Sequence, residues 1–351
     1  MKFDVMPLDQ AVGKILGHNI SGPDGRRLFR KGIPLSEEDV VRLREIGRHS
    51  VYVAELEAND VGENQAAFRI AEACKGDHLY LSKPTTGRAN LHTDILGLLR
   101  VDIDRLMQIN LLESITLATG INNAVVTPRQ MVATLKVIAY GVSDNTVREA
   151  ERIGRAGLIN GDDESRLLSI SPLTRKKVGL ILSGSHTVHE RIVKGFEKAL
   201  IPRLQSWGSD LDYTGFIALE DESDEIALAN EINRLVEDRF EMIILAGETA
   251  IMDRFDIAPR AVERSGGRVT CFGAPVDPGN LLMLARHDQA GYPVQIIGAP
   301  GCARSQKRNI VDLIIPRLLA GDYLTKMDIV QLGMGGMLDD VSERGRPRRL
   351  N

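Results

Sequence analysis

From residue 176 onward, short apolar runs that end in small residues alternate with segments of helical period. The runs include KKVGLILSG, FEMIILAGETA and PVQIIGAPG, and the stretch VHERIVKGFEKALIPRLQSWG is one of the helical segments between them. Continuous apolar runs are typical of strands that are buried on both faces, and helices between such strands indicate crossover connections. We therefore predict an α/β fold for residues 176–325, with a mostly parallel sheet and helices on both faces.

The remainder of the chain lacks this alternation. Short apolar segments broken by turn signals occupy residues 1–57. Residues 58–143 contain a helical segment followed by β-type segments, such as GLLRVDIDRLMQIN, around one further helix. We predict that residues 1–143 form an α+β region with these two parts as subdomains. Residues 144–175 are polar and helical in pattern, which predicts a connector. Residues 326–351 read as a C-terminal tail that ends in an arginine-rich stretch.

The composition excludes several classes of function. With 43% hydrophobic residues the chain can bury a core, but only 4% of its residues are aromatic and its net charge is -4, which disfavours nucleic-acid binding. The three separated cysteines indicate reduced thiols in a cytoplasmic protein. No apolar run reaches the roughly 18 residues of a membrane span. We expect no nucleic-acid and no membrane partner, so any anion site must be local.

Three of the predicted strands end in small residues at the start of a helical segment. These turns are SGSHT (183–187), AGETA (246–250) and APGCARS (299–305). Unpaired N–H groups and the helix dipole make such turns suitable for phosphate, and ligands of open α/β sheets bind beyond the carboxyl ends of strands. Each turn alone is more typical of an ordinary strand–helix connection. Three in one domain favour a shared anionic ligand.

The second turn also carries carboxylates. Glu248, Asp253 and Asp256 lie within one or two helical turns of one another. Carboxylates near a phosphate site are typical ligands of Mg²⁺, whereas acidic residues at a helix start are also favoured by the dipole alone. The pattern leaves both interpretations open. Cys302 lies at a helix start, where a thiol pKa can fall, but a small residue in a tight turn is the simpler interpretation.

Longer segments carry a resemblance to a known family. They are LAGETAIMDRFDIAPRAVERSGG, FGAPVDPGNLLMLA and PVQIIGAPGCARS, together with the N-terminal segments KGIPLSEEDVVRLREIG and QMVATLKVIAYGV. The first resembles the glycine-rich turn of the molybdenum cofactor biosynthesis domain, which molybdopterin adenylyltransferases and molybdopterin molybdotransferases share. The next two are similar to paired loops of the molybdotransferases. The combination is closest to a subgroup of molybdopterin-binding proteins that also occur fused to a nucleotidyltransferase domain.

The resemblance implies a ligand and a site. The ligand would be molybdopterin, a pterin-dithiolene that carries a phosphate, or its adenylylated form with Mg²⁺ and molybdate. Asp253 and Asp256 would be catalytic, and with Glu248 they would hold the metal. The implied cofactor-binding residues come from the strand-end turns and one further loop: Ser183, Gly184, Gly247, Glu248, Thr249, Ala250, Pro278, Gly279, Asn280, Gly301, Cys302, Arg304 and Ser305.

The sequence departs from the family pattern at charged positions. Glu248 stands where the family has a glycine, and Asp277 and Asn280 stand where it has two lysines. These changes weaken an anion site, so either the cations of residues 304–308 compensate or binding is retained without catalysis. Three functions stay open: a molybdotransferase-like enzyme, a carrier that hands the cofactor to a molybdoenzyme or its maturation factor, and a nucleotide pyrophosphatase or amidase. Related domains commonly form dimers or trimers, so the resemblance also implies a homo-oligomer.

Overall fold

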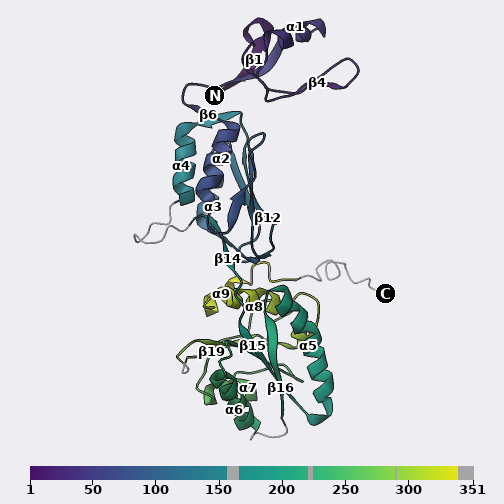
Figure 1. Cartoon of the computed structure of the whole chain (residues 1–351), viewed down its shortest axis with the longest axis vertical. Helices are drawn as coiled ribbons and strands as arrows, with labels where there is room; N and C mark the ends of the chain where they lie inside the picture. Colours follow the sequence, from purple (N-terminus) through teal and green to yellow (C-terminus); the bar gives the residue numbers. More distant parts are fainter. Residues whose placement is uncertain (156–165, 220–223, 289–290, 339–351) are drawn as a thin grey trace, which may run out of the picture. The chain divides into compact units, whose positions relative to one another are not determined.

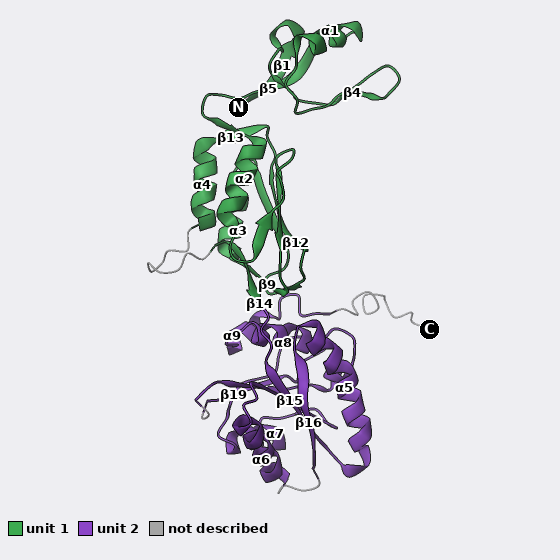
Figure 2. Ribbon diagram, in the orientation of Figure 1, with its two compact units in different colours: residues 1–171 green, residues 172–351 purple. Residues whose placement is uncertain are grey.

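The computed structural model describes residues 1–155, 166–219, 224–288 and 291–338 (Figure 1). The chain folds into two compact units, Met1–Ser171 and Pro172–Asn351 (Figure 2). Each unit has its own hydrophobic core. Among the described residues, no helix has both the length and the apolar character needed to cross a lipid bilayer.

The first part of unit 1 is a small antiparallel sheet with one helix. Its three-stranded sheet has the order β1-β5-β2, and its core includes Leu16, Leu43 and Val53. Helix α1 begins at Ser36, whose hydroxyl accepts the N–H of Asp39 in a capping box. The elements are β1 (Lys2–Pro7), η1 (Leu8–Gln10), β2 (Ile15–Leu16), β3 (Ile20–Ser21), β4 (Arg27–Phe29), α1 (Glu37–Glu45) and β5 (Ser50–Glu55).

The second part of unit 1 contains a four-stranded antiparallel sheet of order β10-β12-β8-β7. Helix α2 packs on β8 and β12, and α4 packs on α2. Buried residues of these elements form one core that includes Ile70, Leu91 and Leu135. The elements are β6 (Asp60–Gly62), α2 (Glu63–Cys74), β7 (Leu79–Leu81), β8 (Arg88–Thr93), β9 (Gly97–Val101), α3 (Ile103–Asn110), β10 (Ile115–Thr119), β11 (Val125–Val126), β12 (Met131–Val137), β13 (Gly141–Ser143), α4 (Asp144–Arg155) and β14 (Leu168–Pro172).

The sequence predicts one helix among the β-type segments of residues 78–142, and α3 is a helix in this range. It lies in GLLRVDIDRLMQIN, where Asp102 caps the helix start by accepting the N–H of Arg105 and α3 follows β9 directly. The predicted connector at 144–175 contributes two elements to unit 1, since α4 packs on α2 and β14 pairs with β9. Residues 156–165 of that prediction lie outside the described residues.

Unit 2 is built on a six-stranded sheet of order β16-β15-β17-β20-β19-β18. Its elements are β15 (Lys177–Gly184), η2 (His186–Val188), α5 (His189–Ser206), β16 (Asp210–Ala218), α6 (Asp224–Glu237), β17 (Met242–Gly247), α7 (Ile257–Arg264), β18 (Arg268–Phe272), β19 (Met283–His287), β20 (Val294–Gly298), η3 (Gly301–Arg304), α8 (Val311–Leu319) and α9 (Lys326–Gln331). Residues 339–351 of the predicted tail lie outside the described residues.

The sheet of unit 2 is mixed, so the predicted mostly parallel sheet is found only in part. Strands β16, β15, β17 and β20 run parallel to one another, whereas β19 is antiparallel to both β18 and β20. The reason lies in the connections. The loops before and after β19 contain no described helix, and neighbouring strands joined without a crossover pair antiparallel.

Helices lie on both faces of this sheet. On one face, strand residues such as Ile181, Ile243 and Leu245 share a core with buried residues of α6 and α7. Alternate strand residues point the other way. At the end of β15, the space beside Gly184 is bounded by Ile192 of α5, which packs on β15 and β16. The two faces are therefore covered by different helices, α6 and α7 on one and α5 on the other.

Candidate functional site

The carboxyl ends of β15 and β17 form a topological switch point. Strand β15 leads through α5 to β16 on one side, and β17 leads through α7 to β18 on the other side. Connections that diverge in this way leave a crevice beyond the strand ends, which is the usual ligand site of open α/β sheets. The turns that follow β15 and β17 are two of the three strand-end turns predicted from the sequence.

A cavity of about 110 Å³ lies at this switch point, on the face that α6 and α7 cover. An engineered apolar cavity of about 150 Å³ holds one benzene ring, so this volume suits one ring-sized group. Five residues of the predicted site line it: Ser183, Gly247, Thr249, Ala250 and Asp256. The remaining lining is mainly apolar and comes from Ile181, Leu219, Leu228, Leu245, Ala246, Ile251, Ile257, Ala258 and Ala299.

Two glycines allow the turns to approach each other. A Cβ on Gly247 would lie 2.8 Å from both the carbonyl oxygen and the Oγ of Ser183. A Cβ on Gly184 would lie 2.9 Å from the Cβ of Glu248. Because side-chain atoms do not fit at such distances, glycine at both positions lets the ends of β15 and β17 close on the cavity.

The three carboxylates near the cavity are bonded to nearby backbone and hydroxyl groups. Glu248 accepts hydrogen bonds from the backbone N–H and the Oγ of Ser185, both at 3.1 Å, and these bonds hold the pKa of Glu248 below its usual value. Asp256 accepts the N–H of Met252 at 2.8 Å. Asp253 accepts the N–H of Phe255 at 2.7 Å. Each carboxylate thus stabilises the turn in which it lies or the turn beside it.

This arrangement does not fit the predicted Mg²⁺ site. Within the described ranges, no group of three or more His, Cys, Asp or Glu side chains is arranged to hold a metal ion. The carboxylate of Glu248 is bonded to Ser185, whereas that of Asp256 accepts the N–H of Met252 in its own loop. We therefore derive no chemical step through a metal at this site.

Only the first residue of the third predicted turn lines the cavity. Ala299 lines the cavity, and its N–H donates to the carbonyl of Leu245 at 2.7 Å. The chain then enters η3, which packs against α5 on the other face of the sheet. None of residues 301–305 is part of the cavity lining. Arg304 instead lies over the ring of Phe196 in α5, at 5.7 Å from the ring centroid.

The segment around η3 presents basic side chains to solvent. Arg304, Lys307 and Arg308 are all exposed. No carboxylate of the described residues forms an ion pair with any of these three cations. Uncompensated cations beside backbone N–H groups are suitable partners for a phosphate. Burial raises the pKa of the Cys302 thiol, so this residue fits the interpretation as a small residue that fills the turn.

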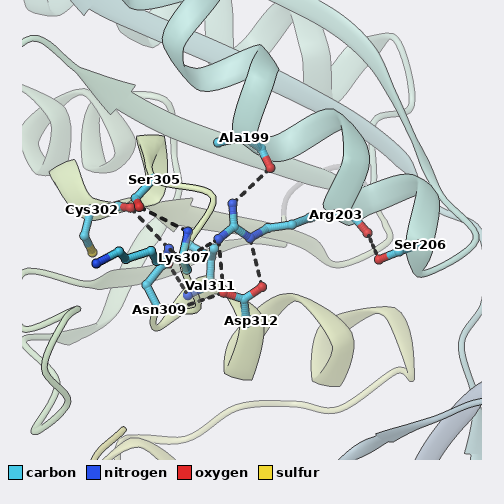
Figure 3. A network of polar contacts seen from close by, with 9 residues as sticks. All are labelled: Ala199, Arg203, Ser206, Cys302, Ser305, Lys307, Asn309, Val311 and Asp312. Atoms are coloured by element: carbon cyan, nitrogen blue, oxygen red, sulfur yellow. Dashed lines mark hydrogen bonds and ion pairs between the residues drawn. The ribbon is translucent and has the colours of Figure 1, made fainter. Parts of the chain in front are cut away.

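A buried arginine holds this basic segment in place (Figure 3). Arg203 of α5 is 8% exposed. Its Nε donates to Asp312 Oδ1 at 2.8 Å, its Nη2 to the carbonyl of Lys307 at 2.7 Å, and its Nη1 to the carbonyl of Ala199 at 3.0 Å. Asn309 adds bonds from its Nδ2 to the carbonyls of Cys302 and Lys307. The network ties η3 and the start of α8 to α5.

The predicted residues Pro278, Gly279 and Asn280 lie in the loop between β18 and β19. The carbonyl of Pro278 accepts the N–H of Ile310 at 3.2 Å. Gly279 has φ +145°, and a Cβ there would lie 2.3 Å from the Cβ of Ile310. This loop therefore contacts the segment that follows η3, and its three predicted residues are not part of the cavity lining.

Sequence reasoning did not single out Arg203 or the apolar lining from α6. A signal for Arg203 exists, because Ile192, Phe196, Ala199 and Arg203 recur at helical spacing and all four are buried. A charged residue on an apolar stripe needs a buried partner. No comparable signal marks Leu228, whose place in the lining depends on how α6 crosses the sheet.

Comparisons with known proteins do not establish a family for this chain. A family model described as "Domain of unknown function (DUF8806)" matches residues 5–55. No curated protein matches the chain. Among solved structures, a molybdenum cofactor biosynthesis protein from Pyrococcus furiosus is 11% identical with a TM-score of 0.23, over 91% of this chain and 63% of that one. The molybdopterin biosynthesis moeA protein from Pyrococcus horikoshii OT3 is 12% identical with a TM-score of 0.26, over 94% and 75%.

The chain thus spans 63% of the length of the first of these structures, which is less than two thirds. At TM-scores this low, the likeness carries no conclusion about the fold or the function of this chain.

Proposed function

We propose that unit 2 binds molybdopterin at the carboxyl edge of its sheet and acts in molybdenum cofactor biosynthesis. The observation that carries the proposal is the cavity at the switch point of β15 and β17, which five residues of the predicted site line. The resemblance of the segments around residues 245–267 and 293–305 supplies the identity of the ligand.

The charges around the cavity favour one orientation of this ligand. Asp256 places negative charge at the cavity, which repels a phosphate. A pterin ring carries N–H donors, and a carboxylate such as Asp256 accepts hydrogen bonds. One edge of the fused pterin ring therefore enters the cavity, because a volume of about 110 Å³ is too small for the whole ring system.

We place the phosphate end of the ligand at the η3 segment, beyond the carboxyl end of β20. Strands β17 and β20 are hydrogen-bonded neighbours, so the cavity and the η3 segment begin at adjacent strand ends. Arg304 and Lys307 are exposed there, and Arg203 fixes the backbone between them and α8. The proposed ligand lies across the edge of the sheet, with its ring beside Ala250 and its phosphate beside Arg304.

Equilibrium binding of molybdopterin to the full chain tests this proposal. Ala250→Phe fills the cavity and Arg304→Gln removes a charged donor, and each should weaken binding about tenfold or more. Arg268→Gln is the matched control, because Arg268 is an exposed cation of β18 that is part of neither the cavity lining nor the η3 segment. Binding that is unchanged in both site variants, or equally weakened in the control, contradicts the proposal.

A carrier function is a second candidate that one observation favours. Glu248 and Asp256, two of the predicted metal ligands, serve the local structure of their turns. A protein that binds and hands over the cofactor needs no metal-assisted step. The assay is incubation of the chain with adenylylated molybdopterin, Mg²⁺ and molybdate. Release of AMP that disappears in Asp253→Asn or Asp256→Asn supports a transferase, whereas tight binding without AMP release supports the carrier.

A further inference from the structure

The four-stranded sheet of unit 1 has one face that its helices do not cover. In β8, Ala89, Leu91 and Thr93 are buried, and the first two belong to the core that contains α2 and α4. The alternate residues Arg88 and Asn90 point away from that core. The uncovered face is therefore polar.

Two cations of this face stand directly opposite each other. Arg88 of β8 pairs with Lys136 of β12 in the antiparallel register. Like charges in this position are destabilising unless something offsets them. Arg88 is exposed, and its Nη1 contacts the hydroxyl of Thr134 at 3.4 Å. The positive charges of Arg88 and Lys136 therefore repel each other on this face of the sheet.

The charge around this pair remains positive. Lys136 lies 3.7 Å from the carboxylate of Glu63, the single ion pair of the cluster among the described residues. Burial lowers the pKa of Lys136, Glu63 acts in the opposite direction, and the positive charges of Arg88 and Lys31 lower it further. The two opposed cations thus have one carboxylate at Lys136, and a bound anion would relieve their repulsion.

A tight turn holds these groups in a fixed arrangement. Thr85 and Arg88 exchange backbone hydrogen bonds at 3.1 and 3.0 Å, and the two residues between them have positive φ, Thr86 at +49° and Gly87 at +69°. A β-branched residue rarely adopts this conformation, and such strain is concentrated at functional sites. The carbonyl of Thr86 accepts the Nζ of Lys136 at 2.6 Å.

Glycine is required at the second position of this turn. A Cβ on Gly87 would lie 2.8 Å from the Nζ of Lys136 and 2.8 Å from Oε2 of Glu63. The N–H of Gly87 donates to Oδ1 of Asn64 at 2.8 Å. The turn is thereby closed over Lys136 and tied to the first turn of α2.

From this geometry we propose a phosphate-binding site in unit 1, formed by Arg88 and Lys136. The ligand is a small molecule that carries a phosphate group, because the cluster offers charged donors with one carboxylate already paired to Lys136. Thr134 and Asn90, which are hydrogen-bonded to each other at 2.7 Å, are the neutral groups beside the cations. The site lies in unit 1 and does not depend on the ligand proposed for unit 2.

Equilibrium dialysis of the full chain with radiolabelled inorganic phosphate tests the site. Lys136→Gln and Arg88→Gln should each weaken one phosphate site about tenfold or more, and Lys136→Arg should change it less than about threefold. Arg129→Gln is the matched control, since Arg129 is an exposed cation in the turn before β12, and its backbone N–H donates to the carbonyl of Thr93 at the other end of β8. Arg304→Gln separates this site from any phosphate bound at η3.

The result is decisive in either direction. Weakening confined to Lys136→Gln and Arg88→Gln supports the site. Three results overturn the proposed site. The first is an affinity for phosphate in these two variants equal to that of Arg129→Gln, and the second is no phosphate binding by the full chain. The third is equal weakening in all variants, as expected for an adventitious ion only. Because Arg88 is exposed, Arg88→Gln decides the outcome even if Lys136→Gln lowers the melting temperature.

Discussion

Replacing Arg203 by methionine tests whether the buried network in Figure 3 holds the basic segment of unit 2. Methionine keeps most of the side-chain volume but removes the guanidinium. Asp312, whose side chain is 17% exposed, then keeps only the N–H of Asn309 as a partner, at 2.8 Å. Removing one member of a buried ion pair costs about 3–5 kcal/mol. Because Asp312 retains one bond and some solvent contact, we expect the lower end, about 3 kcal/mol.

Urea unfolding followed by tryptophan fluorescence measures this change. Trp207 is the only tryptophan of the chain and is 7% exposed at the end of α5, so its fluorescence reports on unit 2. The double variant Arg203→Met/Asp312→Leu should be less destabilised than the sum of the two single variants, because neither charge is left unpaired. A loss below about 1 kcal/mol in Arg203→Met, or additive effects in the double variant, would refute the reasoning.

Three further outcomes are expected. Burial raises the pKa of Asp328, but hydrogen bonds from Thr325 and Arg317 outweigh it and hold that pKa at about 2, below its ordinary 3.8. The ionised Asp328 carboxylate therefore stabilises the fold above about pH 3.8, and this effect is lost as the pH falls toward 2. Asp328→Asn should lower the free energy of unfolding by about 2 kcal/mol at pH 7 and cause no such loss near pH 2. Urea titrations at both pH values would measure the difference. Gly279→Ala should lower the melting temperature of unit 2, because its Cβ would lie 2.3 Å from that of Ile310; an unchanged melting curve would contradict this. Ser185→Ala should raise the pKa of Glu248, as carboxyl NMR titration would measure, because it removes the bond from Oγ; an unshifted titration would mean that this bond is absent in solution.

In unit 2, the features of the fold that depend on the residues of a single segment could be predicted from the sequence. Runs such as Met242–Gly247 are apolar throughout, so they predict strands covered on both faces, and the structure places α5 and α6 on opposite faces. The direction of β19 was not predicted, because it depends on pairing between neighbours. The helix at Ile103–Asn110 lies in the range where the sequence predicts one helix among β-type segments, and Asp102 caps its start.

In the candidate site, too, the sequence indicates features that depend on a single segment but not those that depend on how segments pack. Gly247 and Ser183 meet because β15 and β17 are neighbours at a switch point, which follows from strand order and not from either turn alone. The helical connections also decide on which face of the sheet the residues after a strand lie. For that reason the sequence could not indicate that Thr249 lines the cavity whereas Arg304 packs on α5.

The most direct test of the proposed function is a crystal structure of the chain with bound molybdopterin. The proposal predicts density for one edge of the ring in the cavity between Gly247 and Ala250, and density for the phosphate within about 3 Å of a nitrogen of Arg304 or of the η3 backbone. Ligand density away from the carboxyl ends of β15, β17 and β20, or none at saturating ligand, would contradict it.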